Sequence, residues 1–406
     1  MSRPSVLSCL VAFACCVAPV HAADVPALPV GCRPDPVLVA EAEKRFPANQ
    51  WVEITPRSII PEAWQGGRQV YVNSYSSLAY CGSLGVVMTM DGYTTVPAGK
   101  IIPNNYSDSV YTFDPITGAL ELFKRSNWHA GARSKDPAGT SYPYDENRSD
   151  PTPCPRHLYK GITWSPDDDA FYLINGANAG VPNEHPKFAL NNGTATYTFW
   201  AMDVGRRTWK QLPYPKLKRT DQYETVLTAI PGTGKLFYFD AWNVASYDLK
   251  AGTWSVLKGD DGRPVGFNSY AAGGVAMVDS RRRRVVFYWG SSWHTKVPLL
   301  TRDQFYVYDV ATNEHAVLTS TNQLDATPIV AGTYVTHLDT YLLLCDQGLR
   351  TFDPTALAWK ALPVALPAWM SKPGSWTYFT YDAKRQLVIC NSRNNWAVLR
   401  LDGKLP

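Results

Sequence analysis

An all-β fold is predicted by two features of the sequence: a strand–turn–strand pattern that recurs along the chain, and the near absence of helix signals. The clearest copy spans residues 245–257, where Asp248 ends an apolar run and Trp254 and Leu257 stand six and nine positions after it. The spacing recurs at Asp114 with Leu120 and Phe123, Asp203 with Trp209 and Leu212, Asp309 with His315 and Leu318, and Asp353 with Trp359 and Leu362. Repeats of roughly 40 to 50 residues that favour strands are typical of propellers and solenoids, because one unit cannot bury its apolar face alone.

The two ends of the chain complement each other. A sixth copy begins at Asp402, and the sequence ends at Pro406 before a second strand can follow. The second strand of this copy should carry an aromatic residue and, three positions later, an aliphatic one. Trp51 and Ile54, near the start of the chain, match that pattern. We therefore expect an N-terminal strand to pair into the last blade and close a ring, which predicts a β-propeller.

The pattern predicts six blades. The 89 positions between Asp114 and Asp203 could hold another blade, but residues 126–155 are polar and lack a strand pattern. We expect an arm over residues 23–49 that is helical near 38–45, a linker over 56–69, and then the blades. The blades are expected at residues 70–123, from 156, from 223, from 268, around 334–344 and around 376–401. Their first hairpins turn at Pro-, Gly- and Asp-rich sites such as residues 166–169 and 231–234.

The first residues are typical of an export signal. Arg3 precedes an uncharged apolar run over residues 6–20, and small residues precede a cleavage site after Ala22. The predicted organisation is a signal peptide over residues 1–22, the arm over 23–49 and a single propeller domain over 50–406. We expect an exported protein, periplasmic or secreted, without a membrane span. Cys15 offers a lipoprotein anchor as an alternative, which Phe13 disfavours.

Five cysteines remain after the signal is removed: Cys32, Cys81, Cys154, Cys345 and Cys390. An odd number in an oxidising compartment allows one or two disulfides and leaves at least one free thiol or one pairing between chains. Cys345 and Cys390 occupy corresponding strand ends in neighbouring blades. They are either a disulfide pair or two buried small residues.

The charge of the chain does not indicate a nucleic-acid partner. The formal net charge is +4, and the charges are spread along the sequence. Residues 281–284 are four consecutive arginines, but they lie between two apolar runs and are expected at a solvated hairpin tip. Three aspartates at residues 167–169 suggest calcium, yet they stand in a short turn without the rest of a ligand loop, so we expect a solvated turn there as well.

The aspartate hairpin with its Trp and Leu resembles a kelch repeat over roughly residues 50–405. Kelch proteins are β-propellers, so the resemblance implies that fold. The paired glycines of the kelch pattern are replaced here by Asn175-Gly176, Asp240-Ala241, Gly290-Ser291, Asp346-Gln347 and Asn391-Ser392. Exported propellers of this kind include copper oxidases similar to galactose oxidase, which have seven blades, and a sialic-acid epimerase. The resemblance to those enzymes is one of fold, because their motifs have no residue-by-residue match in this chain.

Long loops are predicted on one face of the propeller. The loops at residues 94–108, 126–155, 177–193, 213–222, 291–301 and 320–326 all join the second strand to the third, or the fourth strand to the next blade. The predicted ligand-binding residues at their mouths are Trp128, His129, Arg156, His157, Trp242, Tyr270, Trp293, His294, Asp346 and Arg393. Rings supply apolar contact and the polar groups fix orientation, a combination that suits a sugar or another polar small molecule. Alternatively, the Trp residues fill the loops and the polar groups satisfy the backbone.

Two short motifs are more specific. Residues 126–129 and 291–294 share the pattern Ser-x-Trp-His, which could supply imidazoles for a metal or for proton transfer, or could be coincidence. Arg156 and His157 could orient an anionic substrate, or could serve only to begin a strand.

Two function hypotheses follow. The first is an exported binding module for a carbohydrate or another polar ligand, with a protein as a further class of partner. The second is an enzyme of the same shape. The sequence contains no nucleophile, metal-ligand or phosphate-loop signature, so no catalytic residue, metal or cofactor is predicted.

Overall fold

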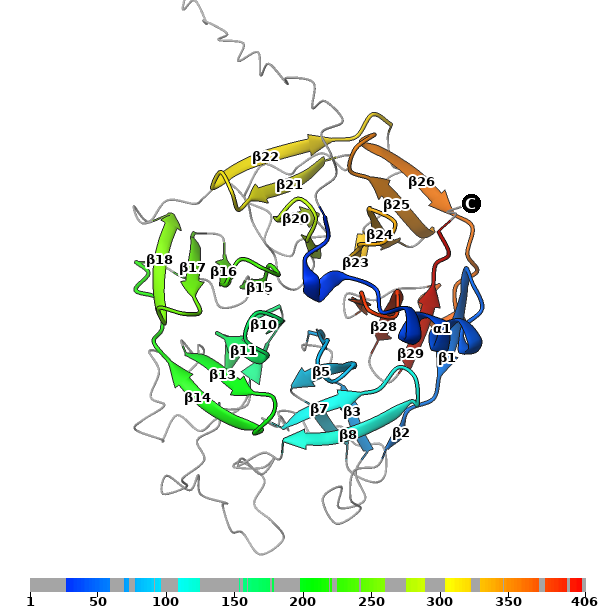
Figure 1. The fold of residues 1–406 in the computed structure, drawn as a ribbon, viewed down its shortest axis with the longest axis horizontal. Coiled ribbons are helices and arrows are strands. Elements are labelled where there is room, and N and C mark those ends of the chain that lie inside the picture. Colours follow the sequence, from blue (N-terminus) through cyan, green and yellow to red (C-terminus); the bar gives the residue numbers. More distant parts are fainter. Residues whose placement is uncertain are drawn as a thin grey trace, which may run out of the picture.

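A computed structural model shows six antiparallel sheets arranged as blades around a central axis (Figure 1). It describes residues 27–58, 69–72, 77–90, 92–95, 109–124, 153, 156–158, 160–175, 177–178, 198–218, 220, 225–240, 242–259, 275–288, 304–322, 329–345, 347–371, 377–392 and 395–403. The predicted all-β, six-bladed propeller is confirmed.

Each blade runs from an inner strand at the axis to an outer strand at the outside of the ring. Blade 1 contains β4 (Ala79–Cys81), β5 (Val86–Met90), β7 (Val110–Phe113) and β8 (Ala119–Lys124). Blade 2 contains β10 (Ile162–Ser165), β11 (Ala170–Ile174), β13 (Phe199–Asp203) and β14 (Thr208–Leu212). Blade 3 contains β15 (Val226–Ala229), β16 (Lys235–Phe239), β17 (Val244–Asp248) and β18 (Thr253–Lys258). Blade 4 contains β19 (Val275–Asp279), β20 (Arg284–Tyr288), β21 (Gln304–Asp309) and β22 (Glu314–Thr319). Blade 5 contains β23 (Ile329–Val335), β24 (Thr340–Cys345), β25 (Gly348–Asp353) and β26 (Ala358–Leu362).

Blade 6 closes the ring with strands from both ends of the chain. β27 (Thr377–Asp382), β28 (Leu387–Ser392) and β29 (Asn395–Arg400) are completed by β1 (Gln50–Ile54), and Trp51 lies opposite Leu399. Asn49, with a φ of 55°, precedes β1 and donates from Nδ2 to Asp402 Oδ1 at 2.9 Å. This contact takes the place of the covalent turn in the other outer hairpins. Arg400, rather than Asp402, stands at the register position of the repeated aspartate, two residues earlier than the sequence pattern indicates.

The repeated aspartates close the outer hairpins. Asp248 Oδ1 accepts a hydrogen bond from the backbone N–H of Ala251 at 2.7 Å, and Asp309 Oδ1 accepts from Ala311 and Thr312 at 2.9 and 3.0 Å. A short acceptor side chain that bonds amides two or three residues ahead favours a tight turn. The hydrogen bonding within the turn therefore explains why aspartate recurs at this position.

The recurring tryptophans pack between blades. Phe199 of β13 lies against Trp254 of β18, with ring centroids 5.1 Å apart, and Phe305 of β21 stacks on Trp359 of β26 at 5.2 Å. In both cases the third strand of one blade meets the outer strand of the next. Aromatic contacts of this kind bind each repeat to its neighbour, which is how a repeat that is unstable alone becomes stable in a ring.

Five short strands lie outside the four-stranded repeat. β2 (Arg57–Ser58), expected in a linker, pairs in parallel with β8 as a fifth strand of blade 1. β3 (Gln69–Val72) pairs with β6 (Gly92–Thr95), and β9 (Arg156–His157) pairs with β12 (Ala177–Asn178). The inner strands of blades 1 and 2 therefore begin later than the sequence indicates, because the residues assigned to their starts form these separate ribbons.

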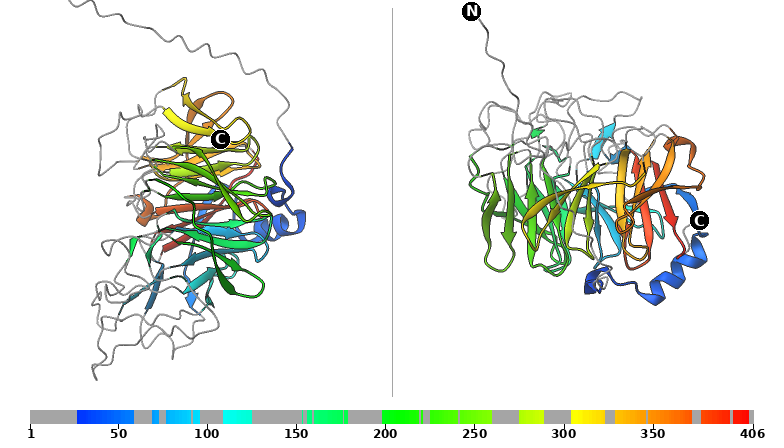
Figure 2. Two further views of the ribbon diagram at one scale, coloured as in Figure 1. Left: turned by 90° about the vertical axis from the view of Figure 1, so that its left-hand side faces the viewer. Right: turned by 90° about the horizontal axis from the view of Figure 1, so that it is seen from above.

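The arm crosses the face of the propeller that carries the short turns (Figure 2). It contains a 3₁₀ turn, η1 (Val30–Cys32), and the expected helix, α1 (Pro36–Arg45). Asp35 caps the helix by accepting from the backbone N–H of Val37 at 2.9 Å, and Phe46 after the helix is fully buried. Among the described residues, no helix is long and apolar enough to cross a membrane.

Candidate functional site

A cavity of about 440 Å³ lies on the propeller axis, where residues from the inner strand of every blade surround it. Volumes of this order are typical of sites for small molecules. The inner strands β4, β10, β15, β19, β23 and β27 begin at one end of the cavity and reach the short turns at the other. We call the second end, which the arm covers, the floor.

The cavity wall combines apolar and hydroxyl-bearing side chains. Val278 and Val330 contribute apolar surface, while Thr228, Tyr378 and Thr380 contribute hydroxyls. No Asp, Glu, Arg or His is found among the described residues that line it. The wall is therefore suited to a polar ligand that combines apolar faces with hydrogen-bonding groups.

Lys160 lies at the end of the cavity where the inner strands begin. Its carbonyl oxygen accepts a hydrogen bond from Leu227 N–H at 3.0 Å, which ties blade 2 to blade 3. Gly161 permits this path, because a Cβ there would lie 2.4 Å from the carbonyl oxygen of Ile174. Burial lowers the pKa of Lys160 from 10.5 to about 7, so its amine titrates near neutral pH.

The N-terminal arm forms part of the floor. Gly31 and Cys32 of η1 line the cavity, and a Cβ on Gly31 would lie 3.1 Å from the Pro166 side chain. The backbone N–H of Asp35 donates to the carbonyl oxygen of Lys384 at 3.0 Å and holds the arm to blade 6. Burial raises the pKa of the Cys32 thiol, which keeps it protonated.

A histidine orients a tyrosine at the floor. His337 Nε2 lies 3.1 Å from the carbonyl oxygen of Leu401, so this nitrogen carries the proton, and Nδ1 accepts from the Tyr381 hydroxyl at 2.6 Å. Burial lowers the pKa of His337 and favours this neutral form. Tyr381 lines the cavity, and because its proton is directed to His337, its oxygen can accept a hydrogen bond from the cavity side.

A buried carboxylate supports the loop that carries Trp242. Asp240 accepts hydrogen bonds from the Tyr238 hydroxyl at 2.6 Å and from the backbone N–H groups of Trp242 and Asn243 at 2.8 and 2.6 Å. These contacts fix the backbone at Trp242, whose side chain is half-buried. Trp242 is thus a predicted ligand residue on a firmly held loop.

The other predicted ligand residues are only partly described. Arg156 and His157 form β9, opposite Asn178 and Ala177, outside the four-stranded part of blade 2. The remaining residues lie outside the described residues, as do both Ser-x-Trp-His motifs: Trp128, His129, Tyr270, Trp293, His294, Asp346 and Arg393. Their roles stay predictions.

The three aspartates at residues 167–169 lie in the expected exposed turn, and two of them also connect blades. Asp167 accepts from the backbone N–H groups of Gly232 and Gly234 in blade 3, both at 2.7 Å. Asp169 accepts from the Ser83 hydroxyl of blade 1 at 2.5 Å. Within the described part of the chain, no group of three or more His, Cys, Asp or Glu side chains could hold a metal ion.

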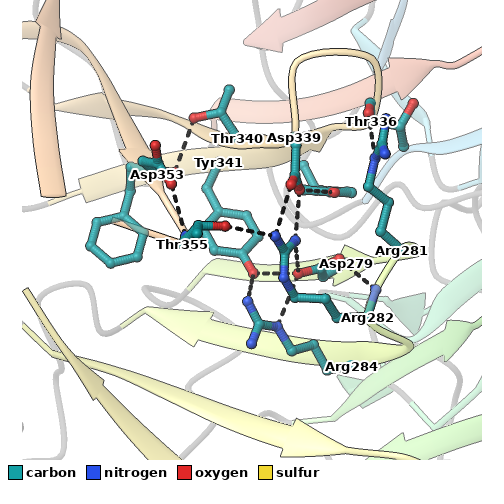
Figure 3. A network of polar contacts seen from close by, with 12 residues as sticks. Asp279, Arg281, Arg282, Arg284, Thr336, Asp339, Thr340, Tyr341, Asp353 and Thr355 are labelled. Carbon is teal, nitrogen blue, oxygen red and sulfur yellow. Dashed lines mark hydrogen bonds and ion pairs between the residues drawn. The ribbon is translucent and has the colours of Figure 1, made fainter. Parts of the chain in front are cut away.

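The arginines at residues 281–284 form the expected hairpin turn, in which Arg283 is exposed while Arg282 and Arg284 are mostly buried in ion pairs. Arg282 pairs with Asp279 at 3.2 Å and with Asp339 of blade 5 at 2.6 Å, and Arg284 pairs with Asp279 at 2.9 Å (Figure 3). The Asp279 side chain is completely buried. Arg282 and Arg284 therefore fasten blade 4 to blade 5, through Asp339 and the Tyr341 hydroxyl.

The four described cysteines, Cys32, Cys81, Cys345 and Cys390, are buried and free. Cys345 and Cys390 belong to different apolar clusters, in agreement with the interpretation that they are small core residues. Cys154 lies outside the described residues.

Comparison with known proteins found no family model that matches the chain and no similar curated protein. The propeller fold is shown by the structure, and the kelch assignment remains a resemblance based on the hairpin pattern.

Proposed function

We propose that this chain is an exported binding propeller that holds a carbohydrate or another polar small molecule in its axial cavity, which the ligand enters from the long-loop face. The cavity itself carries the proposal, because its size and its mixed lining match what such ligands need. Trp242 and the other aromatic residues predicted at the loop mouths would add stacking contacts around the entrance.

Export is part of this proposal and is supported by the signal pattern of residues 1–22. Mass spectrometry of the protein recovered from periplasm and medium should find a mature chain that begins at Ala23. An intact Met1 in cytoplasmic fractions would contradict export and would leave the cavity argument untouched.

Binding in the cavity can be tested by blocking it. Ala276 lines the cavity on β19, and Ala356 is exposed in an outer turn of blade 5. In a glycan-array screen and calorimetric titrations, Ala276→Trp should abolish binding of each carbohydrate that the mature protein binds, while Ala356→Trp should bind normally. Equal binding by both variants would place the ligand elsewhere, and the absence of any bound carbohydrate would reject a carbohydrate ligand.

An enzyme remains the second candidate, favoured by Lys160. An amine with a pKa of about 7 inside a ligand-sized cavity is suited to general base chemistry. Exchange of carbon-bound hydrogen for deuterium in a bound sugar, followed by NMR in D₂O, should occur with the native chain and stop in Lys160→Met if the protein is such an enzyme.

A further inference from the structure

Lys160 differs from every other described residue of the cavity wall. It alone has a side chain that is charged in water at neutral pH. The other titratable side chains of the described lining are a thiol and four phenols, which are neutral in water at pH 7: Cys32, Tyr80, Tyr334, Tyr378 and Tyr381. The amine therefore gives the cavity a reactive group that its hydroxyls and apolar side chains do not supply.

Aliphatic side chains line the same end of the cavity as Lys160. Val226, Val275 and Ile329 are the first residues of β15, β19 and β23, and all three are buried and line the cavity. Lys160 itself forms a parallel β-bridge with Val226 and is only partly buried. An amine in such surroundings is poorly hydrated, which favours its neutral form over the ammonium.

The backbone on both sides of the Lys160 side chain is held in place. The Leu227 N–H donates to the carbonyl oxygen of Lys160 at 3.0 Å. The Gly161 N–H donates to the carbonyl oxygen of Leu158 at 2.7 Å, and the Gly161 carbonyl oxygen accepts from the Ile174 N–H at 2.8 Å. These contacts fix the point from which the side chain leaves the wall, and a fixed starting point favours a defined approach to a bound ligand.

Burial also makes the amine reactive at neutral pH. It lowers the pKa of Lys160 from 10.5 to about 7, because the buried ammonium loses its hydration. At about pH 7.5, roughly three quarters of the amine is then neutral, against about 0.1% for a lysine with an ordinary pKa. Only the neutral amine has the lone pair that attacks a carbonyl carbon. A lysine in this state is suited to covalent bonding with an aldehyde.

We infer that Lys160 forms a reversible imine with a small hydroxy aldehyde, the chemical class of an open-chain sugar, in the axial cavity. The inference rests on the proposed function, since it requires a polar small molecule in this cavity. An aldehyde is uncharged, which suits a described wall without Asp, Glu, Arg or His. Its carbon chain and its hydroxyl groups match the mixed apolar and hydroxyl-bearing lining.

The reaction uses only the amine, the aldehyde and proton transfers. Nζ bonds to the carbonyl carbon, the π bond of the carbonyl breaks toward oxygen, and a proton moves from nitrogen to that oxygen, which gives a carbinolamine. The hydroxyl group then leaves with the remaining nitrogen proton as water, and the C=N bond forms. Addition of water reverses both steps and releases the aldehyde, so no oxidant, reductant or cofactor takes part.

Reductive trapping tests the inference. The mature chain is incubated with D-glyceraldehyde and sodium cyanoborohydride at about pH 7.5, which reduces an imine to a stable secondary amine, and peptide mass spectrometry locates the adduct. Lys160 should be modified at least about 10-fold faster than the exposed Lys210, because far more of its amine is neutral. This ratio should fall toward pH 10, where ordinary lysines also lose their proton.

Two variants show whether the reaction takes place in the cavity. Ala276→Trp, which fills the cavity from β19, should stop trapping at Lys160 and leave trapping at Lys210 unchanged. Ala356→Trp, in an exposed outer turn, should behave like the native chain. Trapping at Lys160 that persists in Ala276→Trp would mean that the aldehyde reaches the amine from outside the cavity, and would overturn the inference.

Glycerol separates covalent capture from ordinary binding, because it keeps the hydroxyl groups of glyceraldehyde and has no carbonyl group. In calorimetric titrations, Lys160→Met should weaken the binding of glyceraldehyde by about 10- to 100-fold and leave that of glycerol unchanged. An equal loss for both probes would give Lys160 only a packing or hydrogen-bonding role and would contradict the imine.

Failure of the imine and failure of the proposed function give different results. If Ala276→Trp blocks carbohydrate binding but Lys160 is trapped no faster than Lys210, the imine is overturned and cavity binding stands. If Lys160 is trapped selectively but the chain binds no carbohydrate in the glycan array, the carbohydrate ligand is rejected and the imine with a hydroxy aldehyde stands.

Discussion

On the face with the short turns, the residues that join blade 4 to blade 5 differ from those of the cavity floor. We call the ion-paired residues Asp279, Arg282, Arg284 and Asp339 the rim. At the rim, Asp279 accepts from two arginines and from the Tyr341 hydroxyl at 2.7 Å, so a fully buried carboxylate is well paired. At the floor, the very next residue is Ser280, a neutral side chain whose hydroxyl interacts with the Cys32 thiol. The contrast teaches that charged groups hold neighbouring blades together at the rim, whereas neutral groups close the cavity at the floor.

Removing the Asp279 carboxylate, the central charge of the rim, should give the largest loss of stability. Asp279→Ala leaves Arg282 and Arg284 without their shared carboxylate and the buried Tyr341 hydroxyl without its acceptor. Breaking a buried ionic network by removing one member costs about 3–5 kcal/mol. Urea unfolding should show a destabilisation of this order. A change below about 1 kcal/mol, the scale of an exposed pair, would show that the rim is not a structural clamp.

A matched pair of arginines should sharpen this contrast. Arg282 and Arg206 each pair with an aspartate three residues earlier at 3.2 Å, but the Arg206 side chain is 83% exposed and that of Arg282 is 20% exposed. Arg282→Met should lower the free energy of unfolding by about 1.5–3 kcal/mol, because charged hydrogen bonds are lost. Arg206→Met should cost about 0–1 kcal/mol. Equal losses in denaturant titrations would show that burial does not separate the two pairs.

The Lys160 amine should make stability depend on pH. Its folded pKa of about 7 is below the ordinary value of 10.5, so between these values the unfolded chain binds more protons than the folded one. Stability of the native protein should therefore rise, relative to Lys160→Met, as pH increases from about 7 toward 10. Calorimetric melting of both proteins across this range measures the difference. If the difference in stability between the native protein and Lys160→Met stays constant across this pH range, Lys160 has an ordinary pKa.

The smallest effect on stability is expected at the floor. Ser280→Ala and Thr336→Val should each change the melting temperature only slightly, because each removes a neutral hydroxyl whose interaction, with Cys32 or with Tyr381, is weak. Differential scanning calorimetry of the single variants tests this. A loss comparable to that of Arg282→Met would erase the distinction between rim and floor.

Much of the fold was predictable because it depends on local signals. The aspartate turn and the tryptophan six residues later are fixed by short-range hydrogen bonding and by packing on the adjacent blade, and both repeat along the sequence. The closing strand at Trp51 was found for the same reason. The short ribbons were not, since a short stretch such as β3, or the start of the run over residues 156–159 that contains β9, cannot be told from an inner strand by pattern alone.

The site was less predictable because it depends on which turns converge at the axis. Ser280 precedes a conspicuous arginine run, and nothing local marks it as a cavity residue. Lys160 was also missed, although a lysine followed by glycine before an apolar strand is a weak signal of a close backbone approach. The arginines at residues 281–284 were assigned to solvent because their partners are far away in the sequence, 57 residues for Arg282 and Asp339.

A crystal structure of the mature chain with the tightest-binding carbohydrate of the glycan-array screen tests the central claim most directly. We expect the carbohydrate in the axial cavity, surrounded by the inner strands of the blades. A carbohydrate bound elsewhere, with the axial cavity empty, would contradict the account.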